Sequence, residues 1–271
     1  MPSRTPAPTA SQASSQPAKA RPKAGGQAPD KLRAFRGNSF EDYQTHGMHD
    51  FPRPGKMILG FYVGGAGLIS KLLWRWKVED GHLLWDDKSP RVIIMNHQSM
   101  LDPIIAFISL YVHGIRARFI YKDDLDKSRF VTWVVSRCGG IPVARGEADM
   151  AFVRAAKAAL QRGECVFIFP EGTRIKSDED QVEPHKGFAL VARLAKVPVQ
   201  PMAIVGARGI VPKGSHLLRF PRVYMKAGRP IEFKDLKVKN RREMADVMER
   251  TSMEAVYRLR DDLRAEHPGK L

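Results

Sequence analysis

The stretch that decides the fold is RVIIMNHQSMLDP, residues 91–103, together with CVFIFPEGTR, residues 165–174. Each begins as a short apolar run rich in β-branched or aromatic residues, which is typical of a buried strand. Each then becomes polar, and in open α/β sheets ligands collect outside the carboxyl ends of the strands. We therefore expect the two polar clusters to face one crevice.

The rest of the body alternates between strand-like and helix-like runs. Further strands are expected at residues 117–121, 140–144, 199–205 and 223–227. Helical patterns occupy residues 147–162 and 188–196, and a long amphipathic helix follows residue 240. This alternation predicts an α/β fold in which helices flank a mixed or mostly parallel sheet.

Composition bounds the classes of partner. The 271 residues hold 45 Lys and Arg against 29 acidic residues, a formal charge of +16. Such a charge favours phosphate-bearing partners: nucleic acid, anionic lipid or phosphorylated small molecules. No nucleic-acid motif and no interleaving of aromatic and basic residues appears, so no nucleic-acid partner is expected. Two cysteines, Cys138 and Cys165, are too few for a disulfide scaffold or a cysteine-rich zinc site.

The N-terminal region differs sharply from the body. Residues 1–29 contain no Val, Ile, Leu, Phe, Trp or Tyr, so they cannot offset the entropy of ordering, and residues 1–36 are expected to form a disordered basic tail. That tail carries seven basic residues and one acid. It is either a solubilising segment or a polybasic arm that is drawn to an anionic membrane surface.

Residues 37–80 are expected to form a helical segment at the membrane interface. The run MILGFYVGGAGLIS, residues 57–70, holds 14 uncharged residues, too few to span a bilayer, which needs about 20. Basic residues flank the run, and Trp74 and Trp76 follow it, a composition that suits the headgroup region. The run predicts an interfacial or shallow re-entrant helix pair; the alternative is an ordinary buried core helix.

His97 and Asp102 are the candidate catalytic pair. A neutral imidazole can remove a proton from an alcohol near pH 7, and a carboxylate can fix its tautomer. Five residues along an ideal helix rotate by about 500°, which leaves the two side chains about 140° apart around the helix axis. They therefore meet only if part of the segment is a turn. Asp102 followed by Pro103 offers that turn. The alternative is that Asp102 merely caps the following helix.

Basic residues near strand ends form a candidate anion site. Arg174 follows Gly172 and Thr173, where backbone N–H groups and a guanidinium can hold a phosphate together. Arg145 follows the strand expected at 140–144, and Lys186 opens the helix at 188–196. In a chain with 45 basic residues, each alone is more readily explained as a solvated surface charge. Their shared position, after a strand or at the start of a helix, favours the anion site.

These residues resemble a known family. His97 and Asp102, spaced as His-x-x-x-x-Asp, and Phe-Pro-Glu-Gly-Thr-Arg at 169–174 are similar to the signature of the glycerolipid acyltransferases, specifically the PlsC-like 1-acyl-glycerol-3-phosphate acyltransferases. Residues 140–145 and 197–204 resemble the family's two other blocks, although 142–144 lack its bulkier residues and Gln200 interrupts the last block. The resemblance spans residues 55–230, and the tail and the last helix lie outside it.

The resemblance implies a twisted mixed sheet in residues 81–271 and a one-step acyl transfer without a metal or redox cofactor. His97 would be the general base and Asp102 its orienting partner. The donor would be acyl-CoA or acyl-acyl-carrier protein and the acceptor a lysophospholipid, at the cytoplasmic face of a membrane. The resemblance assigns acceptor binding to Arg145, Glu171, Gly172, Thr173, Arg174 and Lys186.

Within this reading the leading acceptor is lysophosphatidic acid, which would give phosphatidic acid. Another lysophospholipid, a lyso-ornithine lipid or glycerol 3-phosphate is the alternative acceptor. Metal-dependent hydrolysis at the pair of His97 and Asp102 is a second class, but the sequence offers no further cluster at ligand spacing, since His113 and His185 stand apart. A non-catalytic binder of anionic lipid is a third class.

Overall fold

A computed structural model describes residues 40–122, 129–143, 150–175, 183–211, 217–238, 240 and 243–269. The chain divides into two units, Met1–Ala34 and Phe35–Leu271, and all described residues belong to the second. The tail expected at 1–36 lies outside them. The helices are α1 (Phe40–Thr45), α2 (Arg53–Trp74), α3 (His82–Trp85), α4 (Asp102–Val112), α5 (Arg129–Arg137), α6 (Met150–Gln161), α7 (Gly187–Ala195) and α8 (Glu243–Glu266), with 3-10 turns η1 (Met48–Asp50), η3 (Ala207–Gly209) and η4 (Phe233–Asp235).

The strands form one sheet. They are β1 (Lys77–Glu79), β2 (Val92–Met95), β3 (Ala117–Lys122), β4 (Ile141–Val143), β5 (Cys165–Ile168), β6 (Val199–Val205) and β7 (Tyr224–Ala227). In the described part of the chain their order is β1-β7-β6-β2-β5-β3-β4, and every neighbouring pair is parallel except β6 and β7. The expected α/β fold with a mixed, mostly parallel sheet is confirmed, and each expected strand lies within a residue or two of its predicted bounds. The three-residue strand β1 was not predicted, because it is too short and too polar to show a period.

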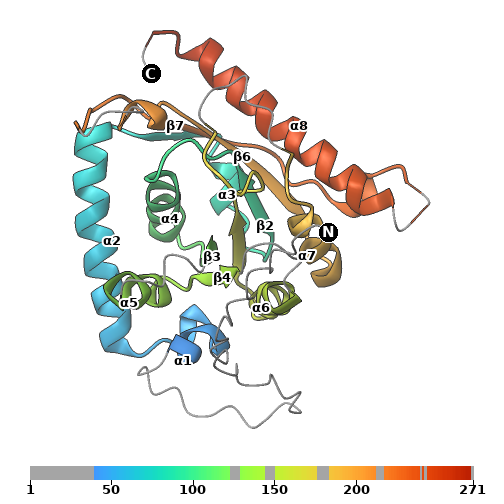
Figure 1. Ribbon diagram of the computed structural model, residues 1–271, viewed down its shortest axis with the longest axis horizontal. Coiled ribbons are helices and arrows are strands. Elements are labelled where there is room, and N and C mark those ends of the chain that lie inside the picture. The colour runs from blue at the N-terminus through green and yellow to red at the C-terminus, as the bar shows by residue number, and fades with distance from the viewer. Residues whose placement is uncertain are drawn as a thin grey trace, which may run out of the picture. The chain divides into compact units, whose positions relative to one another are not determined.

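Helices cover both faces of the sheet, as Figure 1 shows, with α4 and α2 on one side and α6, α7 and α8 on the other. Side chains alternate along a strand. Ile93 and Met95 of β2 therefore join one core cluster with residues of α2 and α4. Val92 and Ile94 join the other, with residues of α6, α7 and α8. β2 is buried on both faces, which explains its continuous apolar run.

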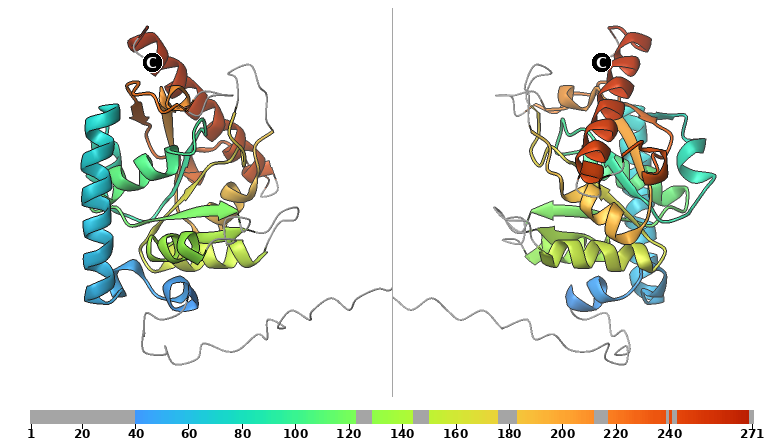
Figure 2. Two further views of the ribbon diagram at one scale, coloured as in Figure 1. Left: turned by 60° about the vertical axis from the view of Figure 1, so that its left-hand side comes forward. Right: turned by 90° about the vertical axis from the view of Figure 1, so that its right-hand side faces the viewer.

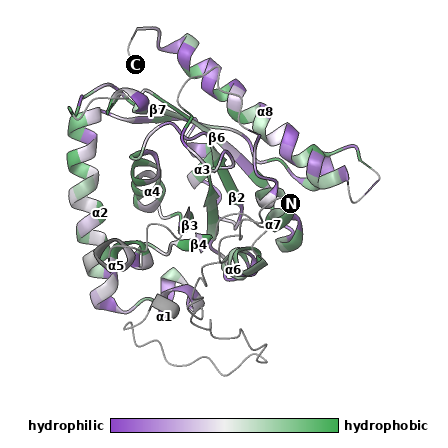
Figure 3. Ribbon diagram, viewed as in Figure 1, coloured by the Kyte–Doolittle hydropathy of each residue, from purple (hydrophilic) through white to green (hydrophobic). Residues whose placement is uncertain are grey.

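The apolar run at 57–70 is part of one continuous helix and not of a helix pair. α2 extends beyond the uncharged residues at both ends and has 22 residues, so by length and composition alone it could cross a membrane. Packing against α4 stabilises it despite its glycines; a Cβ on Gly67 would lie 3.1 Å from Ile108 of α4. Figure 2 shows that α2 runs along one side of the fold, and Figure 3 shows the hydropathy of each residue along it.

The outer face of α2 is apolar and exposed. Its members are between 52 and 85% exposed: Met57, Phe61, Tyr62, Leu68, Ile69 and Leu72. The two tryptophans, in contrast, are buried in the fold, whereas the expected contact with lipid headgroups would require them to face outward. Trp74 and Trp76 are 8 and 6% exposed, and their indole N–H groups donate to the carbonyl of Arg219 at 3.0 Å and to Ser70 Oγ at 3.1 Å. Burial with satisfied N–H groups gives these tryptophans a packing role.

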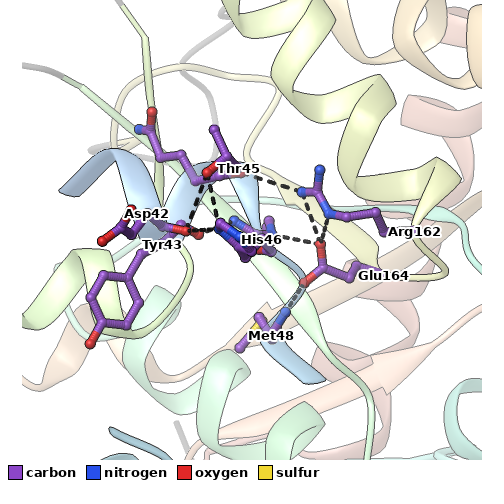
Figure 4. Close-up of polar contacts among 9 residues, drawn as sticks. Asp42, Tyr43, Thr45, His46, Met48, Arg162 and Glu164 are labelled. Atoms are coloured by element: carbon purple, nitrogen blue, oxygen red, sulfur yellow. Dashed lines mark hydrogen bonds and ion pairs between the residues drawn. The ribbon is translucent and has the colours of Figure 1, made fainter. Parts of the chain in front are cut away.

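A buried ionic cluster holds the segment before α2 against the sheet (Figure 4). Glu164, just before β5, is fully buried; its Oε1 accepts the backbone N–H of Met48 at 2.7 Å, and its Oε2 lies 2.8 Å from Arg118 Nε on β3. Arg118 also donates to the carbonyls of Tyr43, at 2.9 Å, and of His46. These bonds fix the point from which α2 begins.

Candidate active site

Both polar clusters leave the sheet at the same edge. β2 and β5 are parallel neighbours in the register Ile94 to Ile168, so residues 96–102 and 169–175 emerge side by side, as expected. Asn96 fixes the first loop to β6: its Nδ2 donates to the carbonyl of Ile204 at 3.0 Å, and its Oδ1 accepts that residue's N–H at 2.8 Å. The second loop is tied to the first, since the N–H of Ile175 donates to the carbonyl of His97 at 2.8 Å.

The structure brings His97 and Asp102 together. His97 Nδ1 lies 3.0 Å from Asp102 Oδ2, and a turn between β2 and α4 allows the contact. Because a carboxylate only accepts, Nδ1 carries the proton, and Nε2 is the nitrogen left to take one up. The side chain of Asp102 is fully buried, whereas that of His97 is 17% exposed. The imidazole also stacks on Phe169, with ring centroids 4.3 Å apart.

Asp102 does not cap α4 in the predicted way. It is the first residue of the helix, Leu101 is the N-cap, and the cap makes no side-chain hydrogen bond. Instead, Asp102 Oδ2 accepts the backbone N–H groups of Gln98, at 2.5 Å, and Ser99, at 2.7 Å. The carboxylate therefore points back into the loop that carries His97, and orients both the loop and the imidazole.

Glu171 is the second buried carboxyl group of the site. It is 1% exposed, and its Oε2 accepts the backbone N–H of His97 at 2.7 Å. The hydroxyl of Tyr257 on α8 lies 3.4 Å from Oε1. Burial raises the pKa of Glu171 to about 7, against the opposing effect of these hydrogen-bond donors. The resemblance places Glu171 in the acceptor pocket, which stays a prediction; in the structure its side chain contacts the loop that carries His97 and the hydroxyl of Tyr257.

Gly172 takes a conformation that other residues adopt at a cost. Its φ is +60°, and a Cβ there would lie 2.6 Å from the ring of His185. The backbone N–H of His185 donates to the carbonyl of Pro170 at 2.8 Å, which holds the two segments together. His185 thus lies at the site although it stands apart in the sequence.

The basic candidates have different surroundings. Thr173 and Arg174 are exposed at the end of the loop after β5. Lys186 is the N-cap of α7, and its Nζ lies 3.0 Å from Asp246 on α8, so its charge is directed to an acidic partner on that helix. Arg145 lies outside the described residues. Four of the candidate residues therefore lie together: His97 bonds to both Asp102 and Glu171, and Gly172 follows Glu171 in the chain. The charged end of Lys186 is instead paired with Asp246.

The two cysteines and one group of possible metal ligands lie outside the loops that carry His97 and Glu171. Burial raises the pKa of Cys165, and that of Cys138 to about 12, so both remain protonated thiols. Among the described residues, Glu79, Glu266 and His267 form a group with the spacing of metal ligands. That group sits on β1 and the end of α8, with β7 and β6 between it and β2, and Lys226 Nζ already lies 2.5 Å from Glu266.

The fold and the site together define an α/β enzyme with a histidine–carboxylate pair at the carboxyl edge of its sheet. Comparison with known proteins makes the class specific. Residues 75–205 match the model of the acyltransferase family. A 1-acyl-sn-glycerol-3-phosphate acyltransferase of Streptococcus pneumoniae is 26% identical over 78% of this chain and 77% of its own. A chloroplastic enzyme of the same name from Brassica napus is 33% identical over 47% of this chain, but only 36% of its own length is covered.

The fold also matches a solved structure. The crystal structure of the 1-acyl-sn-glycerophosphate acyltransferase PlsC from Thermotoga maritima has a TM-score of 0.58, with 24% identity, over 76% of this chain and 80% of that one. The resemblance seen in the motifs is confirmed: residues 75–205 form an acyltransferase domain, and the chain is similar to proteins named 1-acyl-sn-glycerol-3-phosphate acyltransferases. The likeness to the PlsC structure shows a shared fold.

Proposed function

We propose that the chain transfers a fatty acyl group from acyl-CoA or acyl-acyl-carrier protein to the sn-2 hydroxyl of 1-acyl-glycerol 3-phosphate, giving phosphatidic acid. The observation that carries the proposal is the 3.0 Å contact between His97 Nδ1 and Asp102 Oδ2, beside the loop that ends in Arg174. The names of the curated relatives support the choice of lysophosphatidic acid as the acceptor.

In the proposed mechanism His97 acts as the general base. Its Nε2 takes the proton of the acceptor hydroxyl while the oxygen attacks the thioester carbonyl carbon, and Asp102 stabilises the imidazolium that forms. The tetrahedral intermediate then collapses, the carbon–sulfur bond breaks, and the leaving thiolate receives the proton from His97. The products are the new ester and the free thiol of the donor, and His97 returns to its neutral form.

The state of the cysteines supports direct transfer without an acyl-enzyme. A thiol attacks as its thiolate, and burial raises the pKa of Cys138 and Cys165 away from neutral pH. Neither cysteine is in the two loops that carry His97 and Glu171. The acceptor hydroxyl is therefore the attacking group in this proposal.

Arg174 and Thr173 are the proposed contacts of the acceptor phosphate. Both are exposed in the loop whose next residue, Ile175, is bonded to His97, so a phosphate bound there would lie near the base. A guanidinium suits this task because it offers paired donors to phosphate oxygens. Arg145 stays a proposed second contact. Lys186 stays a proposed helper, although its Nζ lies 3.0 Å from Asp246.

We further propose that the enzyme works at an anionic membrane surface, on its cytoplasmic side. The exposed apolar face of α2 supports docking to the acyl-chain region, and the basic tail supports attraction to anionic headgroups. The acceptor and the product are both lipids, so a membrane-bound enzyme would meet its substrate where it resides.

Acyl transfer from labelled acyl-CoA, and separately from acyl-acyl-carrier protein, tests the proposal. The acceptor panel holds lysophosphatidic acid, glycerol 3-phosphate, a lyso-ornithine lipid and lysophosphatidylcholine, with wild type and His97→Ala in parallel. Labelled phosphatidic acid that disappears in the variant is the expected result. Product from another acceptor would keep the acyl transfer but replace lysophosphatidic acid as the acceptor. No product with either donor would overturn the proposed activity.

A further inference from the structure

Tyr257 reaches the active site from a helix that lies beyond the matched family region. The family model ends at residue 205, whereas Tyr257 is in the middle of α8. α8 packs along β6, the strand next to β2, and this packing brings the phenol hydroxyl to 3.4 Å from Glu171 Oε1. No motif in the sequence points to this residue.

The two oxygens of Glu171 contact different parts of the fold. Oε2 accepts the backbone N–H of His97 at 2.7 Å, within the normal range for a strong bond to a carboxylate. Oε1 faces Tyr257 at 3.4 Å, longer than a usual O–H···O bond, as catalytic hydrogen bonds often are before the substrate binds. Because the carboxyl group is 1% exposed, water competes little for either oxygen.

Four groups face Glu171 and determine its charge. His97, through its N–H, comes from the loop after β2, and Asp102, a like charge, is the first residue of α4. Tyr257 and Arg260 come from α8. Tyr257 remains a donor throughout the neutral range, since its own pKa is raised to about 12 by burial. Its hydroxyl and Arg260 favour the ionised form of Glu171, whereas burial and Asp102 oppose it.

We propose that Tyr257 is a positioning residue of this enzyme: its hydroxyl holds the Glu171 carboxylate in the orientation that fixes the backbone of His97. The C-terminal helix is thereby part of the active site. This inference rests on the proposed function in one respect only, since His97 is taken as the base. The contact between Tyr257 and Glu171 can be tested without any substrate.

The test is Tyr257→Phe, which removes one oxygen and keeps the ring on α8. Loss of the hydroxyl removes a donor to the ionised form of Glu171, so the pKa of Glu171 rises. Because the ionised carboxyl group is the form proposed to hold the backbone of His97, we expect the step in kcat that follows the ionisation of Glu171 to move to higher pH by roughly half a unit to one unit, the size of one hydrogen bond. Tyr111→Phe, at a half-buried tyrosine at the other end of α4 from Asp102, is the matched control and should leave this step in place.

The same substitution made in a Glu171→Gln background distinguishes a positioning role of Tyr257 from general loosening of the structure. Glu171→Gln keeps an oxygen that can accept the N–H of His97 but does not titrate. In that background Tyr257→Phe should leave the pH profile unchanged. A shift that is equally large in Glu171→Gln would overturn the inference, because it could not act through the carboxyl group.

Carbon-13 NMR of protein labelled at the glutamate carboxyl carbons measures the same contact directly. The signal missing from Glu171→Gln is that of Glu171, and its midpoint should lie higher in Tyr257→Phe than in wild type. An unchanged midpoint overturns the inference whether or not the chain acylates lysophosphatidic acid. Conversely, a shifted midpoint with no transfer to any acceptor supports the contact and rejects the proposed function.

Discussion

Asp102 Oδ2 lies 3.0 Å from His97 Nδ1 and at the same time accepts the backbone N–H groups of Gln98 and Ser99. One oxygen atom therefore sets both the tautomer of the imidazole and the shape of the loop that carries it. This double task explains why the carboxylate is fully buried although it belongs to a catalytic pair. It also predicts that the two members of the pair respond differently to substitution.

His97→Ala should abolish acyl transfer and leave the fold intact, because the partly exposed ring contributes little to the core. Asp102→Asn should lower kcat by on the order of 10³- to 10⁴-fold, since an amide can hold the wrong tautomer. It should also lower the thermal unfolding temperature, since the two N–H groups of the loop lose their charged acceptor. Steady-state kinetics and calorimetry check both; substantial turnover in His97→Ala would reject the base assignment.

Arg174→Ala should raise the KM for the lysophospholipid acceptor roughly 10- to 100-fold, because a charge-assisted bond to phosphate is lost. The KM for the acyl donor should change much less. Arg229→Ala is the matched control, since this arginine is also exposed but follows β7 at the opposite edge of the sheet. Equal effects on acceptor and donor would contradict a contact with the acceptor phosphate.

Much of this site could be predicted from the sequence. The strands β2 and β5 are apolar over their full length, so their ends, and therefore the neighbouring positions of His97 and Glu171, follow from local pattern and sheet topology. What no local pattern contains is contact between distant segments. Tyr257 and His185 join the site only because α8 and the segment before α7 pack there. Likewise, the indole N–H of the buried Trp74 finds its acceptor in the distant carbonyl of Arg219.

The outer face of α2 should determine binding to neutral membranes. Phe61→Ser combined with Leu72→Ser should lower the partition coefficient onto phosphatidylcholine vesicles by at least about 100-fold, since each buried apolar side chain contributes about 1.5–3 kcal/mol. Both side chains are more than two-thirds exposed, so the fold should not change. Leu194→Ser, on α7 across the sheet, is the control. Vesicle sedimentation measures all three proteins.

Salt distinguishes this apolar contact from the basic tail. Deletion of residues 1–29 should weaken binding only to vesicles that contain anionic lipid, and the difference from wild type should vanish at high ionic strength. The double variant of α2 should lose binding at any salt concentration. Equal binding to anionic vesicles with and without the tail would remove its proposed role.

Glu164→Ala should reduce the free energy of unfolding by about 3–5 kcal/mol, since it leaves the buried Arg118 without its counter-charge. The N–H of Met48 loses its acceptor as well, so the segment before α2 should become sensitive to protease before the sheet unfolds. Glu232→Ala, in an exposed ion pair with Lys234, should change stability far less. Urea unfolding and limited proteolysis measure the two effects.

Glu171 should make the stability of the protein fall as the pH rises. Its pKa is raised from 4.5 to about 7 in the folded state, so between these values the folded protein binds more protons than the unfolded chain. Full ionisation above pH 7 therefore costs about 3 kcal/mol relative to acid pH. Glu171→Gln does not titrate, and its stability relative to wild type should increase from pH 5 to pH 8 in urea unfolding. Glu254→Gln, an exposed glutamate on the same helix as Tyr257, should show no such trend. A stability difference between Glu171→Gln and wild type that stays constant with pH would contradict a raised pKa of Glu171 in the folded protein.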